Sequence, residues 1–381
     1  MRNLRHLIGM RGPARAGRGE RREAGAAIIS ALLVVSLAAI LVAGILWRQQ
    51  VQIRRIENQR LLAQAQWVAL GAFDWTRLIL RSEADVSPTV TYLGGVWAVP
   101  IAKTRLSDFL GKIGQANAVE GGQTYLAGSI EDAQAKFNLR NLVSIPAPGA
   151  LQINQAQVQA FARLLTLLGL NGSLARNAAL EVRAGLLSSA TRFQVPAFNG
   201  VGTPQATQQV GGDTIGGNNF TDKPGLADAG NDDTDAAPLQ MMSVDSLLNV
   251  PGFTPEMVAR LRPFVTVLPT QTSVNMNTAS AEVVAAVTPG MSLSNAQAFV
   301  ARRETVFFRN AGDVTNALQG AGVLPVTTTS DAGQVPFDVT TSYFFVHGRV
   351  THERAEVDRT TLVFRDPLTH TTRVVSVRDQ L

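Results

Sequence analysis

The residues best suited to chemistry in this chain are four aspartates in a Gly-rich segment. Asp228, Asp232, Asp233 and Asp235 lie close together, with Asn231 between them. Carboxylate and amide oxygens on a loop are the ligands that Ca²⁺ prefers, so the cluster predicts a calcium site. The spacing lacks the terminal Glu of an EF-hand, and a solvated acidic loop is the alternative interpretation. Calcium is the only cofactor that the sequence suggests.

The sequence provides little evidence for a catalytic group. The chain contains no Cys and four His. His347 and His352 are five residues apart on an expected strand, so they face opposite sides and cannot chelate one ion together. We find no Gly-rich phosphate loop between a strand and a helix, and no nucleophile elbow. The sequence predicts a protein that is not an enzyme and has no small-molecule substrate.

The positive charge is concentrated at the N-terminus. Residues 1–25 hold seven Arg and two Glu, a net charge of +5, which equals the net charge of the whole chain. The remaining residues therefore sum to zero. A basic leader of this kind is typical of membrane topology, and the neutral remainder argues against nucleic-acid binding.

An apolar run follows the leader directly. The segment from Ala26 to Trp47 includes no charged residue and no Pro. As a helix it would extend ~33 Å, enough to cross the hydrocarbon core of a bilayer. Arg21 and Arg22 predict a cytoplasmic N-terminus by the positive-inside rule, which places the bulk of the chain across the membrane.

The helical pattern continues beyond the apolar run. Apolar residues recur at spacings of three and four from Val51 to Ile79, with no strong breaker before Ser82. We expect one long helix that is apolar all round at first and amphipathic later. A cleaved secretory signal, cut near Ala38 or Ala43, is the alternative, but its apolar region would be only about 7–15 residues long.

The basic leader that ends at Gly25, followed at once by the apolar helix, resembles the prepilin-peptidase site of type IV pilins and type II secretion pseudopilins. The resemblance implies cleavage between Gly25 and Ala26 and N-methylation of Ala26. These families commonly carry Glu at the fifth mature position, where this chain has Ser30. That Glu is typically absent from the subunit K family of minor pseudopilins, so the missing carboxylate implies an exceptional place in the filament, as at a tip.

A second motif supports the same family. The segment DAQAKFNLRNLV resembles a subunit K motif that joins the sheet to an inserted helical domain. The matching residues are Asp132, Phe137, Asn138, Asn141 and Leu142. Independently of the resemblance, Asn side chains can satisfy backbone groups in tight connections, and the apolar members can enter a core.

The middle of the chain changes character. AQVQAFARLLTLLGL and LARNAALEVRAGLL predict amphipathic helices, and the Gly- and Asn-rich segment 195–237 predicts a long loop. Two later units, 247–265 and 282–303, each place a helix, a Pro-Gly turn and a second helix in order. They resemble helix-hairpin-helix modules. Because Thr254 and Ser292 replace the usual second Gly of the turn, we expect packing units rather than DNA binding.

Strands are expected before and after this helical region. A strand with edge character is expected within 96–106, another begins near Thr124, and three more occupy 343–350, 355–365 and 372–377. We expect an α+β fold in which the long N-terminal helix packs on a small antiparallel sheet, the pseudopilin fold, with a large inserted helical domain. The expected segments are a cleaved leader 1–25, a long helix 26–81 that spans the membrane in 26–47, the first part of the head 82–145, the insertion 146–325, and the C-terminal strands of the head 326–381.

The resemblance implies a non-enzymatic minor pseudopilin of a type II secretion system that caps or initiates the pseudopilus tip and supports export of folded proteins from the periplasm. Its implied partners are other minor pseudopilins, the inner-membrane secretion platform and prepilin peptidase. The expected location is the bacterial inner membrane, with a single pass and a periplasmic C-terminal domain. The alternatives are a type IV pilus minor pilin and a membrane-anchored DNA-uptake protein.

Overall fold

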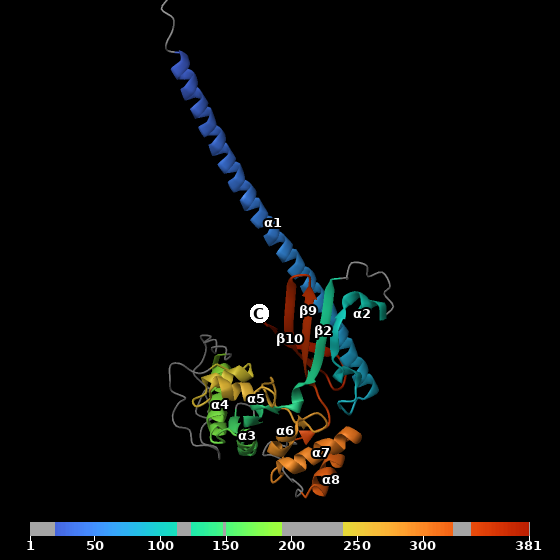
Figure 1. The fold of residues 1–381 in the computed structure, drawn as a ribbon. Coiled ribbons are helices and arrows are strands. Elements are labelled where there is room, and N and C mark those ends of the chain that lie inside the picture. Colours follow the sequence, from blue (N-terminus) through green and yellow to red (C-terminus); the bar gives the residue numbers. More distant parts are fainter. Residues whose placement is uncertain (1–19, 113–122, 148–149, 193–238, 323–336, 381) are drawn as a thin grey trace, which may run out of the picture. The chain divides into compact units, whose positions relative to one another are not determined.

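The computed structural model describes residues 20–112, 123–147, 150–192, 239–322 and 337–380 (Figure 1). It divides into two units, residues 1–64 and residues 65–381. The predicted calcium ligands Asp228, Asp232, Asp233 and Asp235 and the predicted loop 195–237 lie outside the described residues.

Helix α1 (Glu20–Val86) is 67 residues long and dominates the N-terminal part of the chain. No Pro interrupts it, and Pro88 follows two residues after its end, where Pro is common because it cannot continue a helix. The predicted helix, 26–81, was too short at both ends. Charged helix formers extend α1 ahead of Gly25, and Ser82 does not stop it because its backbone N–H can still bond within the helix.

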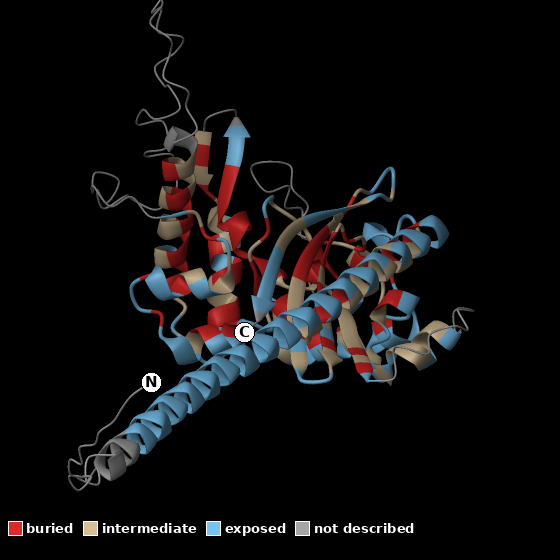
Figure 2. Ribbon diagram, turned by 90° about the horizontal axis from the view of Figure 1, so that it is seen from above, coloured by how far each residue is buried: buried red, intermediate tan, exposed pale blue. Residues whose placement is uncertain are grey.

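The first unit contains the part of α1 up to Gln64. Every residue from 27 to 60 is exposed, including Leu33, Ile40 and Trp47, and Figure 2 shows this as a continuous pale blue ribbon. Within the described residues, α1 is the one helix long and apolar enough to cross a membrane, judged by length and composition. In the part of the chain that the structure describes, this apolar surface is not buried.

The second unit contains a five-stranded antiparallel sheet in the order β1-β2-β9-β10-β11. Its strands are β1 (Ile101–Arg105), β2 (Thr124–Asp132), β9 (Tyr343–His352), β10 (Ala355–Arg365) and β11 (Thr372–Gln380). The predicted edge strand is β1, preceded by Pro100, although Val96–Ala98 within the predicted segment forms a 3₁₀ turn, η1. Helix α2 (Leu106–Lys112) follows β1.

Strands β2 and β9 are adjacent in the sheet although the whole segment 133–342 separates them in the sequence. They pair from Thr124 with His352 to Asp132 with Phe344. The chain therefore leaves the sheet at Asp132 and returns at Tyr343. The described residues between these two points contribute no strand to this sheet.

Alternation along the strands gives the sheet two apolar faces. Phe344 and Val346 of β9 pack with Leu80 of α1, Trp97 and Val363 on one face. The other face carries a second small cluster in which Tyr343 and Leu362 pack with Ala133 and Leu268.

The segment between β2 and β9 is mostly helical and has a core of its own. The helices are α3 (Gln155–Leu167), α4 (Leu174–Arg192), α5 (Pro255–Leu261), α6 (Ala281–Val287), α7 (Leu293–Thr305) and α8 (Ala311–Gly320), with 3₁₀ turns η3 (Ala133–Ala135), η4 (Leu139–Leu142) and η7 (Val244–Asn249). Short strand pairs complete it: β3 (Phe137–Asn138) with β6 (Val265–Thr266), β4 (Val143–Ala147) with β5 (Ala150–Ile153), and β7 (Val274–Asn275) with β8 (Phe337–Asp338). Polar N-caps begin several helices: Asn154, Thr254, Ser280, Ser292 and Asn310 each accept a backbone N–H three residues ahead.

The two predicted hairpin units differ from each other. In the second, α6 and α7 flank the turn at Gly290, whose φ of +79° explains the Gly. In the first, the predicted leading helix is the 3₁₀ turn η7, and Gly252 with φ of +97° precedes α5. The helix-hairpin-helix interpretation stays a prediction, and the observed class is a mixed helix and sheet structure with a long N-terminal apolar helix.

Candidate functional site

Asp132 lies at the end of β2 and is the centre of a buried polar cluster, 2% exposed. Its Oδ1 accepts the backbone N–H of Gln134 at 2.7 Å. Its Oδ2 accepts hydrogen bonds from Thr278 Oγ1 at 2.6 Å, Thr341 Oγ1 at 2.7 Å and Asn275 Nδ2 at 2.9 Å. One carboxylate thus connects the end of β2, the helical segment and Thr341, which lies two residues ahead of β9. We call these five residues the Asp132 junction.

In the junction, hydrogen-bond donors of the protein take the place of the water that would solvate the Asp132 carboxylate. Burial raises the pKa of Asp132, and the hydrogen bonds, that from Thr278 first, act in the opposite direction. Arg365 supplies a nearby positive charge and donates to the carbonyl oxygen of Thr341 at 3.0 Å. Moving a buried carboxylate with four donors is costly, because four hydrogen bonds to it break together.

Asn138 and Asn141 of the motif form hydrogen bonds with a different segment, residues 268–272. Asn138 Oδ1 accepts the backbone N–H groups of Arg140 and Leu268, at 3.0 and 3.1 Å. Asn141 accepts the N–H of Thr272 at 3.0 Å and donates to the carbonyl of the same residue at 2.7 Å. The two Asn side chains therefore bond to the backbone of 268–272 as neighbouring strands would.

The apolar members of the motif enter the core of the helical segment. Phe137 and Leu142 are fully buried, and the ring of Phe137 stacks on Phe161 with 5.5 Å between centroids. The structure thus brings the five motif residues predicted from sequence into one connected region. It adds Asn275, Thr278, Thr341 and Arg365, which the sequence reasoning missed because only folding brings them close.

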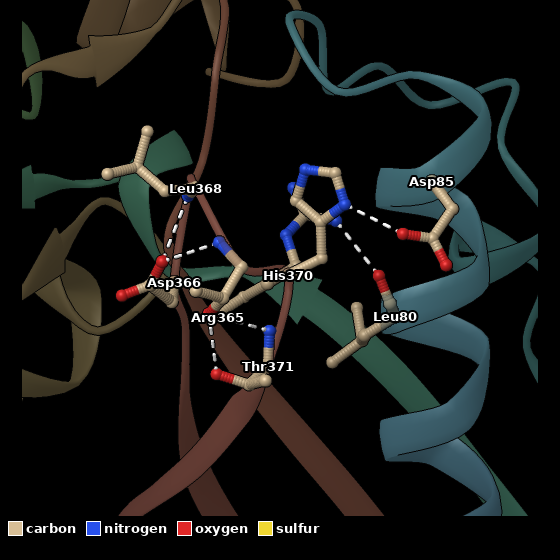
Figure 3. Close-up of polar contacts among 8 residues, drawn as sticks. Leu80, Asp85, Arg365, Asp366, Leu368, His370 and Thr371 are labelled. Carbon is tan, nitrogen blue, oxygen red and sulfur yellow. Dashed lines mark hydrogen bonds and ion pairs between the residues drawn. The ribbon is translucent and has the colours of Figure 1, made fainter.

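A second polar contact joins α1 to the turn between β10 and β11 (Figure 3). Arg365 donates to the carbonyl oxygen of Leu80 at 3.2 Å, and His370 Nδ1 lies 2.7 Å from Asp85 Oδ1. Asp366 holds the turn, because its Oδ1 accepts the N–H groups of Leu368 and Thr369 at 2.9 and 2.8 Å. These contacts position the end of α1 against the sheet.

Between α1 and the sheet lies an apolar cavity of about 340 Å³. Ala72 and Trp75 of α1, Val99, Phe109 of α2 and Val346 of β9 are among its lining residues. Its lining is mostly apolar, although Ser129, His347 and Arg359 also contribute to it.

Comparison with known proteins agrees with this architecture. Two family models, both described as "Type II secretion system (T2SS), protein K", match residues 274–333 and 199–270. Both matches support a minor pseudopilin of the type II secretion system protein K family. The N-terminal apolar helix is consistent with a single membrane anchor.

Curated members of the family match most of the chain. "Type II secretion system protein K" of Pseudomonas aeruginosa is 28% identical, over 87% of this chain and 85% of the relative. The protein of the same description from Pectobacterium carotovorum is 27% identical, over 85% and 87%. Among solved structures, one chain of the GspK-GspI-GspJ complex from enterotoxigenic Escherichia coli shares the fold, with a TM-score of 0.55, 16% identity, and coverage of 86% of this chain and 99% of that one.

The predicted processing residues lie in α1. Gly25 and Ala26 fall within the helix, and their side chains are outside the description. Ser30 is exposed and its hydroxyl donates to the carbonyl oxygen of Ala27 at 2.9 Å. Their roles remain predictions. Among the described residues, no group of three His, Cys, Asp or Glu is arranged to hold a metal ion, and the calcium prediction concerns residues beyond them.

Proposed function

We propose that this chain caps or initiates the tip of a type II pseudopilus, anchored in the bacterial inner membrane by residues 26–47 with its head in the periplasm. The single observation that carries the proposal is the exposure of every residue from 27 to 60 of α1, most of them apolar up to Trp47. Such a surface is stable only in lipid or against other apolar helices. As a precursor, the helix would lie in the lipid of the membrane. After assembly, it would pack against the apolar helices of other subunits in the filament.

The proposed processing follows from the leader. Prepilin peptidase would remove residues 1–25 and methylate Ala26, leaving an apolar helix without a charged residue ahead of it. Ser30 cannot form the ion pair that Glu would make with the terminal amine of a neighbouring subunit. This supports a position at which no such neighbour is present, which is a filament end.

The fold suggests separate roles for the sheet and for the helical segment inserted into it. The segments on either side of 133–342, which contain the strands of the five-stranded sheet, would form the head. The segment 133–342 would be the insertion that blocks addition of another subunit above it. The solved relative unites GspK with GspI and GspJ, so we propose partners of the same kind for this chain, together with the secretion platform.

The test uses the absence of Cys, which makes one introduced thiol a unique label. Leu368 lies in the β10–β11 turn and is 89% exposed, so Leu368→Cys should fold normally and react with maleimide-gold. In cells that overproduce pseudopili, the proposal predicts gold at one end of each filament. Gold along the filament length would contradict tip placement, and the unsubstituted chain provides the unlabelled control.

A further inference from the structure

Four arginines follow the apolar run of α1 at close spacing. Arg48, Arg54, Arg55 and Arg60 all lie between Trp47 and Leu61, and Glu57 is the only acidic residue among them. All four arginines are exposed on the helix. This part of α1 therefore presents a net charge of +3 directly after the segment proposed to span the bilayer.

Helix geometry separates these arginines by their distance from the apolar run. At 1.5 Å per residue, Arg54 and Arg55 lie roughly 10 to 12 Å beyond Trp47, and Arg60 lies about 19 to 20 Å beyond it. The headgroup layer extends about 5 to 8 Å from the hydrocarbon core. Helical side chains tilt toward the N-terminus, which here is toward the bilayer, and long Arg stems snorkel to the interface. Arg48, Arg54 and Arg55 are therefore within reach of headgroup phosphates, and Arg60 is not.

The positions of Arg48, Arg54 and Arg55 around the helix axis favour one basic patch. Arg48 and Arg55 are seven residues apart and lie within about 20° of one line along the helix, with Arg54 about 100° from Arg55. The planar guanidinium binds phosphate oxygens through two parallel hydrogen bonds, which suits phosphodiester headgroups. We call Arg48, Arg54 and Arg55 the arginine collar.

We propose that the arginine collar binds the phosphate groups of anionic phospholipids in the leaflet on the side of the head. The proposal rests on insertion of α1 in the bilayer. It assigns the collar a regulatory part in anchoring: once the leader and its seven arginines are removed, the collar is the basic group that remains beside the span. It sets the depth of the helix until other subunits replace the lipid.

The experiment reconstitutes the full chain in vesicles of phosphatidylcholine and phosphatidylglycerol mixed two to one. Electron paramagnetic resonance of spin-labelled phosphatidylglycerol, compared with spin-labelled phosphatidylcholine, gives the preference of the protein for the anionic lipid. The test variant is Arg48→Gln/Arg54→Gln/Arg55→Gln. The matched control is Arg60→Gln, which removes the same kind of charge from the same helix farther from the membrane. The leader is identical in all samples.

Each surface arginine strengthens attraction to an anionic leaflet about fivefold at low salt. We therefore expect the triple variant to lose at least fivefold of the preference for phosphatidylglycerol, and Arg60→Gln to lose less than twofold. Equal preference in the triple variant and the unsubstituted chain would overturn the proposal, as would an equal loss in Arg60→Gln. Insertion is read separately by flotation with pure phosphatidylcholine vesicles, and failure there would contradict the proposed membrane anchoring itself.

Discussion

Two contacts of different character hold the head sheet to its neighbours: an apolar cluster packs it on α1, and the Asp132 junction binds it to the helical segment. Polar contacts to α1 and a small apolar cluster with Leu268 add to each of them. The first contact joins Leu80, Trp97, Phe344, Val346 and Val363, which need only to exclude water. The second joins a buried carboxylate to donors from distant parts of the chain, each with its own geometry. Apolar contact tolerates small shifts, whereas a buried polar network is stable only when complete. We therefore expect the junction to tolerate substitution less well than the apolar cluster does.

The largest expected effect breaks the junction. Asp132→Ala breaks four buried hydrogen bonds together and leaves the Thr341 hydroxyl and the Gln134 backbone N–H without the acceptor that they have in the structure. We therefore expect a loss of about 3 to 5 kcal/mol in the free energy of unfolding. Urea unfolding of the detergent-solubilised chain measures it. Asp74→Ala is the control, because Asp74 is 60% exposed and its ion pair with Arg77 is worth less than about 1 kcal/mol. Equal losses in both variants would contradict the importance of the junction.

The apolar fastening is tested by two leucines on the same helix. Leu80 is fully buried and Leu78 is 56% exposed. Leu80→Ala should cost roughly 3 kcal/mol through lost burial and the cavity left behind, and Leu78→Ala less than about 0.5 kcal/mol. The same unfolding assay provides both values. A cost for Leu78→Ala as large as that for Leu80→Ala would mean that the other face of α1 is also covered.

The pH dependence of stability distinguishes the two fastenings further. Because burial raises the pKa of Asp132 in the folded state above its ordinary value of 3.8, its contribution is fully present below the unfolded pKa and is lost as pH rises through the folded pKa. We expect the stability of the unsubstituted chain, relative to Asp132→Asn, to fall across that interval. Unfolding measured from pH 3 to pH 7 tests the sign. A relative gain on raising the pH would show that the donors outweigh burial.

The smallest effect concerns the turn that holds α1 to the sheet. Two backbone N–H groups, from Thr369 and Leu368, lower the pKa of Asp366 below 3.8. Its contribution is therefore present above the unfolded pKa and is lost as pH falls through the lower folded pKa. Carboxyl carbon NMR should show Asp366 titrating below 3.8, and Asp132 above it. A pKa of Asp366 at or above that ordinary value would contradict the turn geometry.

Local signals in the sequence predict most of the elements but not the contacts between distant ones. Periodicity and the absence of Pro predict α1, and alternating apolar residues predict β9, β10 and β11. The ends of α1 were missed because Ser82 and Gly25 are weak breakers. The motif from Asp132 to Leu142 was recognisable, yet Asn275, Thr278 and Thr341 carry no local sign of their role. They are 143, 146 and 209 residues from Asp132 in the sequence and meet it only in the folded structure.

Short pairs such as β3 with β6 and β7 with β8 were also beyond prediction. Each has two residues per strand, too few to produce a period, and each is formed by tertiary packing. The 3₁₀ turn η7 stands where an α-helix was expected, because the run before Pro251 is too short for two helical turns.

Processing of this chain as a pseudopilin is tested by its intact mass after isolation from native membranes, with sequencing of its N-terminal peptide. We expect a terminus at Ala26 that carries one methyl group, because prepilin peptidase would cut after Gly25. An intact Met1, or a terminus beyond residue 38, would contradict processing as a pseudopilin.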